Sequence, residues 1–191
     1  MLKFNPPAEP PDFDAKARQL GNNWLVKNKD SKKRPKDYWS KFKIDLADGF
    51  GSLCGYSAMF EPVGTVDHYL SCQNHRHLAY EWSNYRFASA WINSSKGTVD
   101  DQVLDPFLVE DDWFEILLPS LQLVLTDAIP PQERPKAEFT LQRLHLRDHE
   151  LVIRLRQQWY QLYLDGEITL TGLESKAPLI ARAIKKQQST L

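Results

Sequence analysis

The chain has 191 residues, of which 42% are hydrophobic and 12% aromatic, a composition that suits one domain with its own core and excludes an intrinsically disordered protein. The formal net charge is −1 and there are two cysteines, which excludes a disulfide-stabilised secreted scaffold and favours a reducing compartment. The first residues hold no apolar signal core, and no run approaches eighteen apolar residues. We therefore expect a cytoplasmic protein that does not span a membrane.

The first fifty residues predict an extended lead-in, two helical segments and a basic segment. Residues 1–11 are rich in proline and are expected to be extended. Asp12 is a candidate cap for a short helix that Gly21 would end. Aromatic and aliphatic residues recur at helical spacing over residues 38–50, which predicts a second helix.

Charge is unevenly distributed along the chain. Residues 27–43, which we call the basic arm, hold eight lysines and arginines against two aspartates, a local net charge of +6. Residues 97–133 hold no Lys or Arg, and they include an acidic stretch from Asp100 to Glu115. Two interpretations of the arm remain open at this point: a solvated surface, or a segment that contacts phosphate groups.

Residues 51–110 alternate strand-like pieces with turn and loop residues. Residues 52–60 and 63–70 have strand character, and residues 71–83 have the composition of a loop. A brief strand is predicted over residues 84–87, and a short helix follows and ends at Gly97. The expected order around the loop is strand, loop, strand and helix.

Residues 111–191 predict a hairpin followed by helices packed on the core. The hairpin would turn at Pro119 and Ser120. Leu151, Leu155, Trp159 and Leu162 form an apolar stripe in the longest predicted helix. The predicted helices are 137–144, 148–164 with Asp148 as its cap, and 174–186.

Four polar residues in the middle segment combine the groups that metal-assisted hydrolysis needs. Asp67 and His68 are adjacent, Asn84 lies sixteen residues after His68, and Asn93 lies nine residues further on. Carboxylate and amide oxygens are ligands for hard divalent ions, and imidazole is the most frequent general base. An isolated Asp-His pair is more often a strand end without a catalytic role, so the spacing of all four residues carries the interpretation.

Together with the strand, loop, strand and helix order, this spacing resembles the HNH (ββα-metal, His-Me finger) endonuclease motif in its His-Asn-Asn form. The stretches CGYS, TVDHYL, LAYEWSNYRFAS, NSSKG and VLDPF further resemble the HNH nuclease subunit of Septu-type and retron-associated anti-phage defence systems. The resemblance is dense from Cys54 to Phe107 and weaker elsewhere. It implies an α+β fold in which a ββα-metal core at 51–110 lies within a mostly helical domain, with a helical C-terminal third.

The resemblance also implies a role for each residue. His68 would be the general base, and Asn84 would brace the loop and orient the His68 imidazole. Asp67 and Asn93 would hold one Mg²⁺ or Mn²⁺ ion. Lys96 would contact a phosphate. The nucleic-acid contacts of the basic arm would be Lys32, Lys33, Arg34 and Lys36.

Many members of the family bind a structural zinc through two CxxC pairs. The corresponding positions here are Cys54, Ser57, Ser89 and Ile92. With one thiolate in place of four ligands, no zinc is expected, and Trp91 and Ile92 would fill the space. An alternative site built from Cys54 with Cys72, His75 and His77 remains open, although its spacing matches no familiar zinc module.

The implied function is hydrolysis of phosphodiester bonds in phage or other foreign DNA. The chain would be the nuclease effector of a defence system that works with an ABC-type ATPase, and the acidic stretch would be either plain surface or a contact for a basic partner. The alternative is a catalytically weak or inactive module of the same fold that docks nucleic acid or the ATPase.

Overall fold

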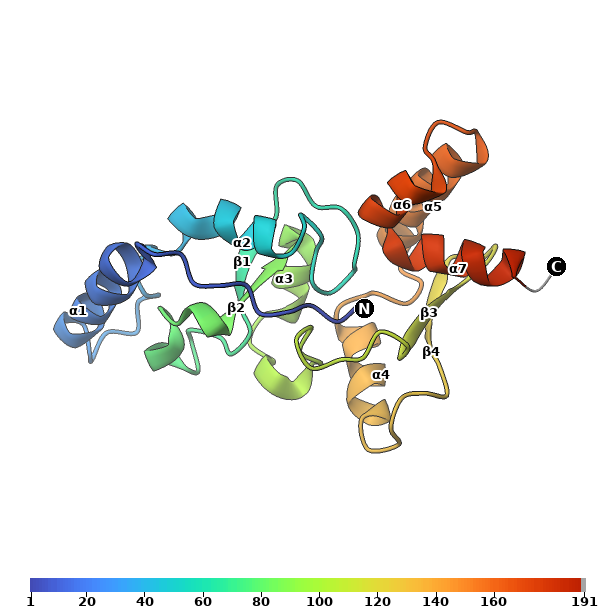
Figure 1. The fold of residues 1–191 in the computed structure, drawn as a ribbon. Helices are drawn as coiled ribbons and strands as arrows, with labels where there is room; N and C mark the ends of the chain where they lie inside the picture. The colour runs from blue at the N-terminus through green and yellow to red at the C-terminus, as the bar shows by residue number, and fades with distance from the viewer. Residues whose placement is uncertain (190–191) are drawn as a thin grey trace.

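A computed structural model describes residues 1–189. Within that range the fold is a mixed α+β arrangement of seven α-helices and two small antiparallel sheets, which confirms the predicted class at that level. Figure 1 shows α1, α2, α3 and the first sheet towards one end of an elongated molecule, and α4 to α7 with the second sheet towards the other. No helix in this range is long and apolar enough to cross a bilayer.

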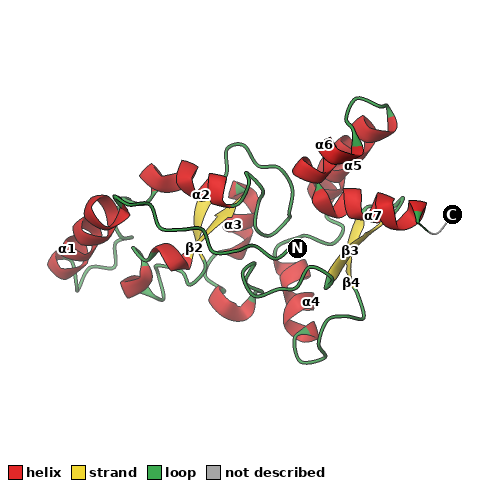
Figure 2. Cartoon of the chain, viewed as in Figure 1, coloured by secondary structure: helices red, strands yellow, loops and turns green. Residues whose placement is uncertain are grey.

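The α-helices are α1 (Gln19–Lys27), α2 (Lys43–Gly49), α3 (Ala90–Lys96), α4 (Arg134–Arg143), α5 (Glu150–Leu164), α6 (Leu170–Lys176) and α7 (Pro178–Gln188). The strands are β1 (Thr65–His68), β2 (Tyr85–Ala88), β3 (Phe114–Leu117) and β4 (Gln122–Leu125). Short 3-10 turns lie at Ser40–Phe42, Arg76–Leu78, Trp82–Asn84 and Asp100–Gln102. Loops and helices make up most of the chain (Figure 2).

The first sheet and α3 form in the predicted order. β1 pairs with β2 antiparallel, with Asp67 opposite Arg86 and His68 opposite Tyr85. Seven of the eight strand residues are buried, so polar side chains of β1 lie inside the protein. α3 follows β2 directly and ends at Gly97, whose φ of +59° is a left-handed conformation that favours glycine.

The strand predicted over residues 52–60 is wrong. The segment makes one isolated bridge, between Leu53 and Phe60, and otherwise folds back on itself. The Cys54 amide donates to the Met59 carbonyl at 2.9 Å, and Ala58 has a left-handed backbone with φ +54°. A tight turn of this kind cannot continue an extended ladder.

The helix end predicted at Gly21 is also wrong. A π-helical turn at Asp14–Arg18 leads into α1, which runs through Gly21 to Lys27. Asp12 makes an ion pair with Lys16 instead of capping the helix with its side chain. A Cβ atom at Gly21 would lie 2.3 Å from ring carbons of Tyr80, so the glycine allows the helix to approach this ring closely.

Replacing Gly21 with alanine is expected to destabilise the protein by about 1–3 kcal/mol, because the Tyr80 ring would have to move. The exposed neighbour Asn22 is a matched control, since Asn22→Ala should stabilise the helix slightly. Urea unfolding of both variants measures the effect. A Gly21→Ala variant as stable as Asn22→Ala would contradict the close contact.

The hairpin prediction is confirmed. β3 and β4 pair antiparallel from Phe114 opposite Leu125 to Leu117 opposite Gln122, and the chain reverses at Pro119 and Ser120 between the strands. α4 begins three residues before its predicted start at Ala137.

The last two predicted helices need correction. The cap of α5 is His149, whose Nδ1 accepts a hydrogen bond from the Leu151 amide at 3.3 Å, and not Asp148. Leu151 is 58% exposed while Val152 is buried, so the buried face is rotated from the predicted stripe. The single helix predicted at 174–186 is two helices, because Pro178 forces the chain to restart after α6.

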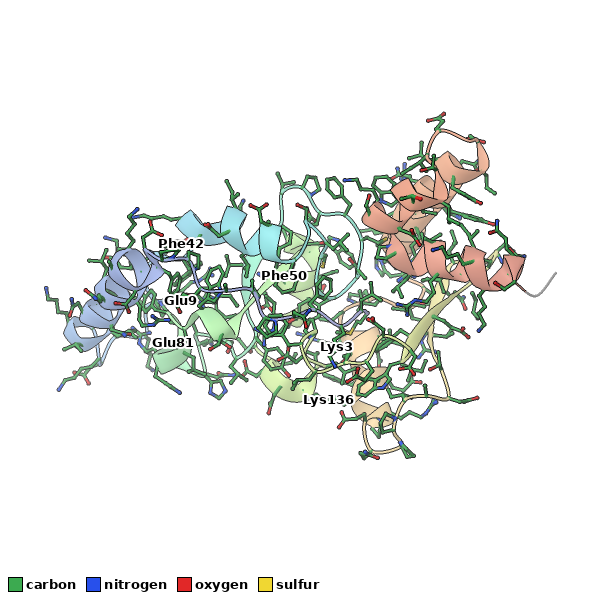
Figure 3. All side chains as sticks on the ribbon, viewed as in Figure 1. Lys3, Glu9, Phe42, Phe50, Glu81 and Lys136 are labelled. Atoms are coloured by element: carbon green, nitrogen blue, oxygen red, sulfur yellow. The ribbon has the colours of Figure 1, made fainter. Side chains whose placement is uncertain are left out.

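Two hydrophobic clusters make up the core, and they cross the predicted boundaries at residues 50 and 110. One cluster joins Phe42 and Phe50, labelled in Figure 3, to β1 and β2. The other joins the turn at Cys54 and helix α3 to the second sheet and the C-terminal helices. The lead-in joins both clusters, because Met1 is buried in the second and Phe4 packs against the first. Pro7 O accepts from the Trp82 indole and the Phe4 amide donates to Pro106 O, both at 2.9 Å.

Candidate active site

The loop between β1 and β2 is held by Asn84. Its Oδ1 accepts from the Leu70 amide at 2.8 Å, and its Nδ2 donates to the carbonyls of Leu70 at 2.9 Å and Leu78 at 3.3 Å. Asn84 thus braces the loop as expected. These bonds all go to backbone atoms, so the expectation that Asn84 orients the His68 ring by hydrogen bonding is wrong.

His68 is oriented by a backbone carbonyl and by two aromatic rings. Its Nε2 lies 2.9 Å from Ala79 O, and the ring meets Trp39 and Tyr85 edge to face at centroid distances of 4.6 and 5.0 Å. Because a carbonyl only accepts, Nε2 carries the proton and Nδ1 keeps its lone pair. Burial lowers the pKa of His68 below its usual value, against the opposing hydrogen bond to Ala79. The imidazole is therefore neutral at neutral pH, as a general base must be.

The Asp67 carboxylate is buried and has a partner on each oxygen. Oδ2 accepts from the Tyr56 hydroxyl at 2.6 Å, and Oδ1 accepts from Lys96 Nζ at 3.1 Å. Burial and the charge of Asp67 raise the pKa of Tyr56 well above its usual value, so this hydroxyl remains a donor.

Lys96 points into the protein, which corrects the expectation that it contacts a phosphate. Its side chain has no exposed area, and Nζ also donates to the carbonyls of His68 and Tyr69, both at 2.9 Å. A lysine near a helix end is normally exposed, so the sequence held no signal of this burial.

Asn93, on α3, is anchored through its amide nitrogen. Nδ2 donates to Thr65 Oγ1 at 2.9 Å and to Val66 O at 3.4 Å. Among the described residues no hydrogen bond uses Asn93 Oδ1. The amide group is therefore held by β1 with its oxygen available as a ligand.

Asp67, His68 and Asn93 line one pocket of about 700 Å³. Each Asp67 oxygen keeps a second lone pair, so the carboxylate and the Asn93 amide oxygen fit a hard divalent ion that takes its remaining ligands from water and substrate. No group of three or more His, Cys, Asp or Glu side chains suited to a metal lies together within residues 1–189. An ion here would share the carboxylate with Lys96.

The basic arm supplies another wall of this pocket. Ser31 to Pro35 line it, including Lys32, Lys33 and Arg34. Lys36 does not line it; its Nζ lies 5.1 Å from the centre of the Tyr38 ring. The tertiary structure thus brings three of the four predicted cations of the arm together with the candidate catalytic residues.

Arg76 holds the arm in this position, and the sequence interpretation missed it. Its guanidinium donates to Lys33 O at 2.8 Å and to Asn28 O at 3.4 Å, and it lies over the Trp24 ring at 5.3 Å. Arg76 also lines the pocket. The sequence feature that could have identified Arg76 as a site residue was its position between His75 and His77 in the loop.

The four positions that the resemblance aligns with zinc ligands, Cys54, Ser57, Ser89 and Ile92, lie in the core. Cys54 Sγ accepts from the Ser89 amide at 3.4 Å, and both Cys54 and Ile92 are fully buried. Ser57 is buried as well. Ile92 packs in the cluster that contains Cys54, which agrees with an apolar filling of this space.

Within residues 1–189, the alternative metal site of Cys54 with Cys72, His75 and His77 is not assembled. Cys72 packs in the other hydrophobic cluster from Cys54. His75 Nε2 lies 3.5 Å from Asp100 Oδ2, and its ring centroid is 6.3 Å from that of His77.

Much of the acidic stretch is used inside the chain. Asp100 accepts from the Ser71 amide at 2.6 Å and from Asn74 Nδ2 at 2.7 Å; burial raises its pKa, but these hydrogen bonds outweigh that effect and lower it. Asp105 is buried against Arg86, and Glu110 pairs with Lys3. Asp100 and Asp105 brace the loop and β2, and Glu110 holds the lead-in, which weakens the case for a docking surface.

The pocket brings together a neutral imidazole, the Asp67 carboxylate and the Asn93 amide, which lie on β1 and α3, with three exposed cations of the basic arm. Comparison with known proteins adds no identity to this geometry: no protein-family model matches the sequence, and no curated protein matches it.

Proposed function

We propose that this chain is a divalent-metal-dependent endonuclease of the HNH type that hydrolyses phosphodiester bonds of DNA. The observation that carries the proposal is the shared pocket of His68, Asp67, Asn93 and the basic arm. Phosphodiester hydrolysis needs a base for the attacking water, positive charge at the phosphate and cations for the flanking phosphates. The pocket holds a candidate for each.

His68 Nδ1 would take a proton from the attacking water while Ala79 O holds the protonated Nε2. A divalent ion held by Asp67 and Asn93 would stabilise the negative charge that develops on the phosphate and the leaving oxygen. The arm would bind phosphates on either side of the cleaved bond without reading the bases.

The resemblance over residues 54–107 supports a narrower form of the proposal. In that form the substrate is phage or other foreign DNA, and an ABC-type ATPase controls the nuclease. The second candidate function, a binding module without strong catalysis, is favoured by one observation: Lys96 already pairs with the Asp67 carboxylate that a metal would need.

Conversion of supercoiled plasmid to nicked or linear forms tests the proposal. The purified chain is incubated with Mg²⁺, Mn²⁺ or EDTA, and matched reactions contain single-stranded DNA or RNA. Cleavage with a divalent ion and none with EDTA is expected. Salt-dependent DNA binding without cleavage under any metal would support the binding module and contradict the nuclease.

Neutralising the arm beside the pocket is expected to weaken DNA binding. The slope of log affinity against log salt should fall by about 0.9 for each phosphate contact that is lost. The test variant replaces Lys32, Lys33 and Arg34 with glutamine. The control replaces Lys27, Lys29 and Lys41 with glutamine; these lysines are exposed and do not line the pocket.

Fluorescence anisotropy of labelled duplex DNA at several salt concentrations measures both slopes. The pocket variant should show a larger fall in DNA affinity and in the salt-dependence slope than the control variant, which has the same net charge. Equal losses in the two variants would mean that the arm acts only through the net charge of the protein.

A further inference from the structure

Lys96 is a buried cation inside the candidate site. Its ammonium group uses its three donors on Asp67 Oδ1, His68 O and Tyr69 O. Of these partners only Asp67 carries charge. A buried ammonium without a carboxylate would be strongly unfavourable, so the two groups depend on each other.

The other nearby cation, Arg86, is paired with a different carboxylate. Arg86 lies opposite Asp67 across the sheet, but its guanidinium makes two bonds to Asp105, at 2.7 and 2.6 Å. Tyr56 donates to Asp67 without adding charge. Among the described residues, Lys96 therefore makes the one ion pair of Asp67.

Lys96 also sets the position of the site. It is the last residue of α3, three residues after Asn93, and its bonds to His68 O and Tyr69 O join this helix to the end of β1. This connection, together with the bonds of Asn93 to Thr65 and Val66, sets the distance between the two candidate ligands on β1 and α3.

We propose that Lys96 is a positioning residue that acts as a built-in counter-cation of Asp67: it holds the carboxylate when no metal is bound and weakens the binding of a divalent ion there. This inference rests on the part of the proposed function that makes Asp67 a metal ligand. A unit charge 3.1 Å from a ligand oxygen repels a second cation on the same carboxylate. Removing the charge should therefore tighten metal binding and leave the metal-free protein less stable.

The test compares Lys96→Met, which keeps length and removes charge, with Lys96→Arg, which keeps the charge. Mn²⁺ binding is followed by electron paramagnetic resonance of the DNA-free protein, and thermal melting is recorded with and without Mn²⁺. Lys96→Met should bind Mn²⁺ about tenfold more tightly than the wild type or better. It should melt several degrees lower without the ion and regain most of that loss with it. Lys96→Arg should bind as weakly as the wild type.

The double variant Asp67→Asn, Lys96→Met should lose the Mn²⁺ effect, which assigns it to this carboxylate. If Lys96→Met does not fold without metal, its refolding yield with and without Mn²⁺ replaces the melting curve. Recovery by Mn²⁺ supports the inference. Unchanged or weaker Mn²⁺ binding in Lys96→Met, or no recovery of folding by Mn²⁺, overturns it.

The outcome is separate from that of the nuclease test, because no DNA and no cleavage enter the binding assay. If the wild type cuts no nucleic acid but Lys96→Met binds Mn²⁺ more tightly, the proposed nuclease function is overturned and the proposed role of Lys96 is supported. If the wild type cleaves DNA but Lys96→Met binds Mn²⁺ no more tightly, the nuclease function is supported and the proposed role of Lys96 is overturned.

Discussion

Replacement of His68 with alanine is expected to lower the rate of the proposed phosphodiester cleavage by about 10²–10⁴-fold, because it removes the base that we propose for the attacking water. DNA affinity should change little, since the proposed phosphate contacts come from the arm. Single-turnover nicking of plasmid DNA measures the rate, and anisotropy measures the affinity. A melting curve establishes that the variant is folded, which matters because the ring packs between Trp39 and Tyr85.

His77→Ala is the matched control for this prediction. His77 lies in the loop that follows β1, is exposed and does not line the pocket. It should cleave at close to the wild-type rate. Equal rates for His68→Ala and the wild type would remove His68 from the proposed chemistry, whereas equal losses in the two histidine variants would indicate a general effect on the loop.

Replacement of Arg86 with methionine is expected to destabilise the fold by about 3–5 kcal/mol, because it leaves the Asp105 carboxylate buried without its cation. The guanidinium also donates to the carbonyls of Ser83 and Tyr85, both at 2.8 Å, and lies 3.6 Å from the centre of the Phe107 ring. Urea unfolding at neutral pH should show a lower midpoint with an unchanged slope.

Two further variants calibrate this result. Arg86→Met combined with Asp105→Leu removes both charges and should recover part of the lost stability. Glu110→Gln breaks the exposed pair with Lys3 and should cost at most about 1 kcal/mol. An Arg86→Met variant as stable as Glu110→Gln would show that the buried pair does not hold β2 in place.

Within the candidate site, the types and spacing of the residues predicted which side chains come together, but not which groups they would contact. The adjacent Asp67 and His68, with Asn84 and Asn93 at set distances, predicted a cluster, and Asp67, His68 and Asn93 do line one pocket. The carbonyl that orients His68 belongs to Ala79. Any residue type supplies such a group, so no side-chain pattern can identify it.

The basic arm illustrates the same limit over a longer distance. Its charge was plain in the sequence, and two interpretations remained open. The part of the arm that lines the pocket, residues 31–35, lies more than thirty residues before His68 in the chain, and Arg76 brings it to the pocket through bonds to backbone carbonyls. Only the folded structure decides which of its cations face the site.

Local signals determined the elements whose own residues stabilise them. The β1 and β2 strands, the end of α3 at Gly97 and the hairpin of β3 and β4 follow from side-chain type and turn chemistry over a few neighbouring residues. Tertiary packing decided the cases in which a distant group competes with a local preference. Gly21 lies inside α1, where the Tyr80 ring packs so closely that a side chain would not fit, and Lys96 is buried because Asp67 and two backbone carbonyls compensate its charge. These partners come from other parts of the chain, and short-range sequence patterns carry no information about them.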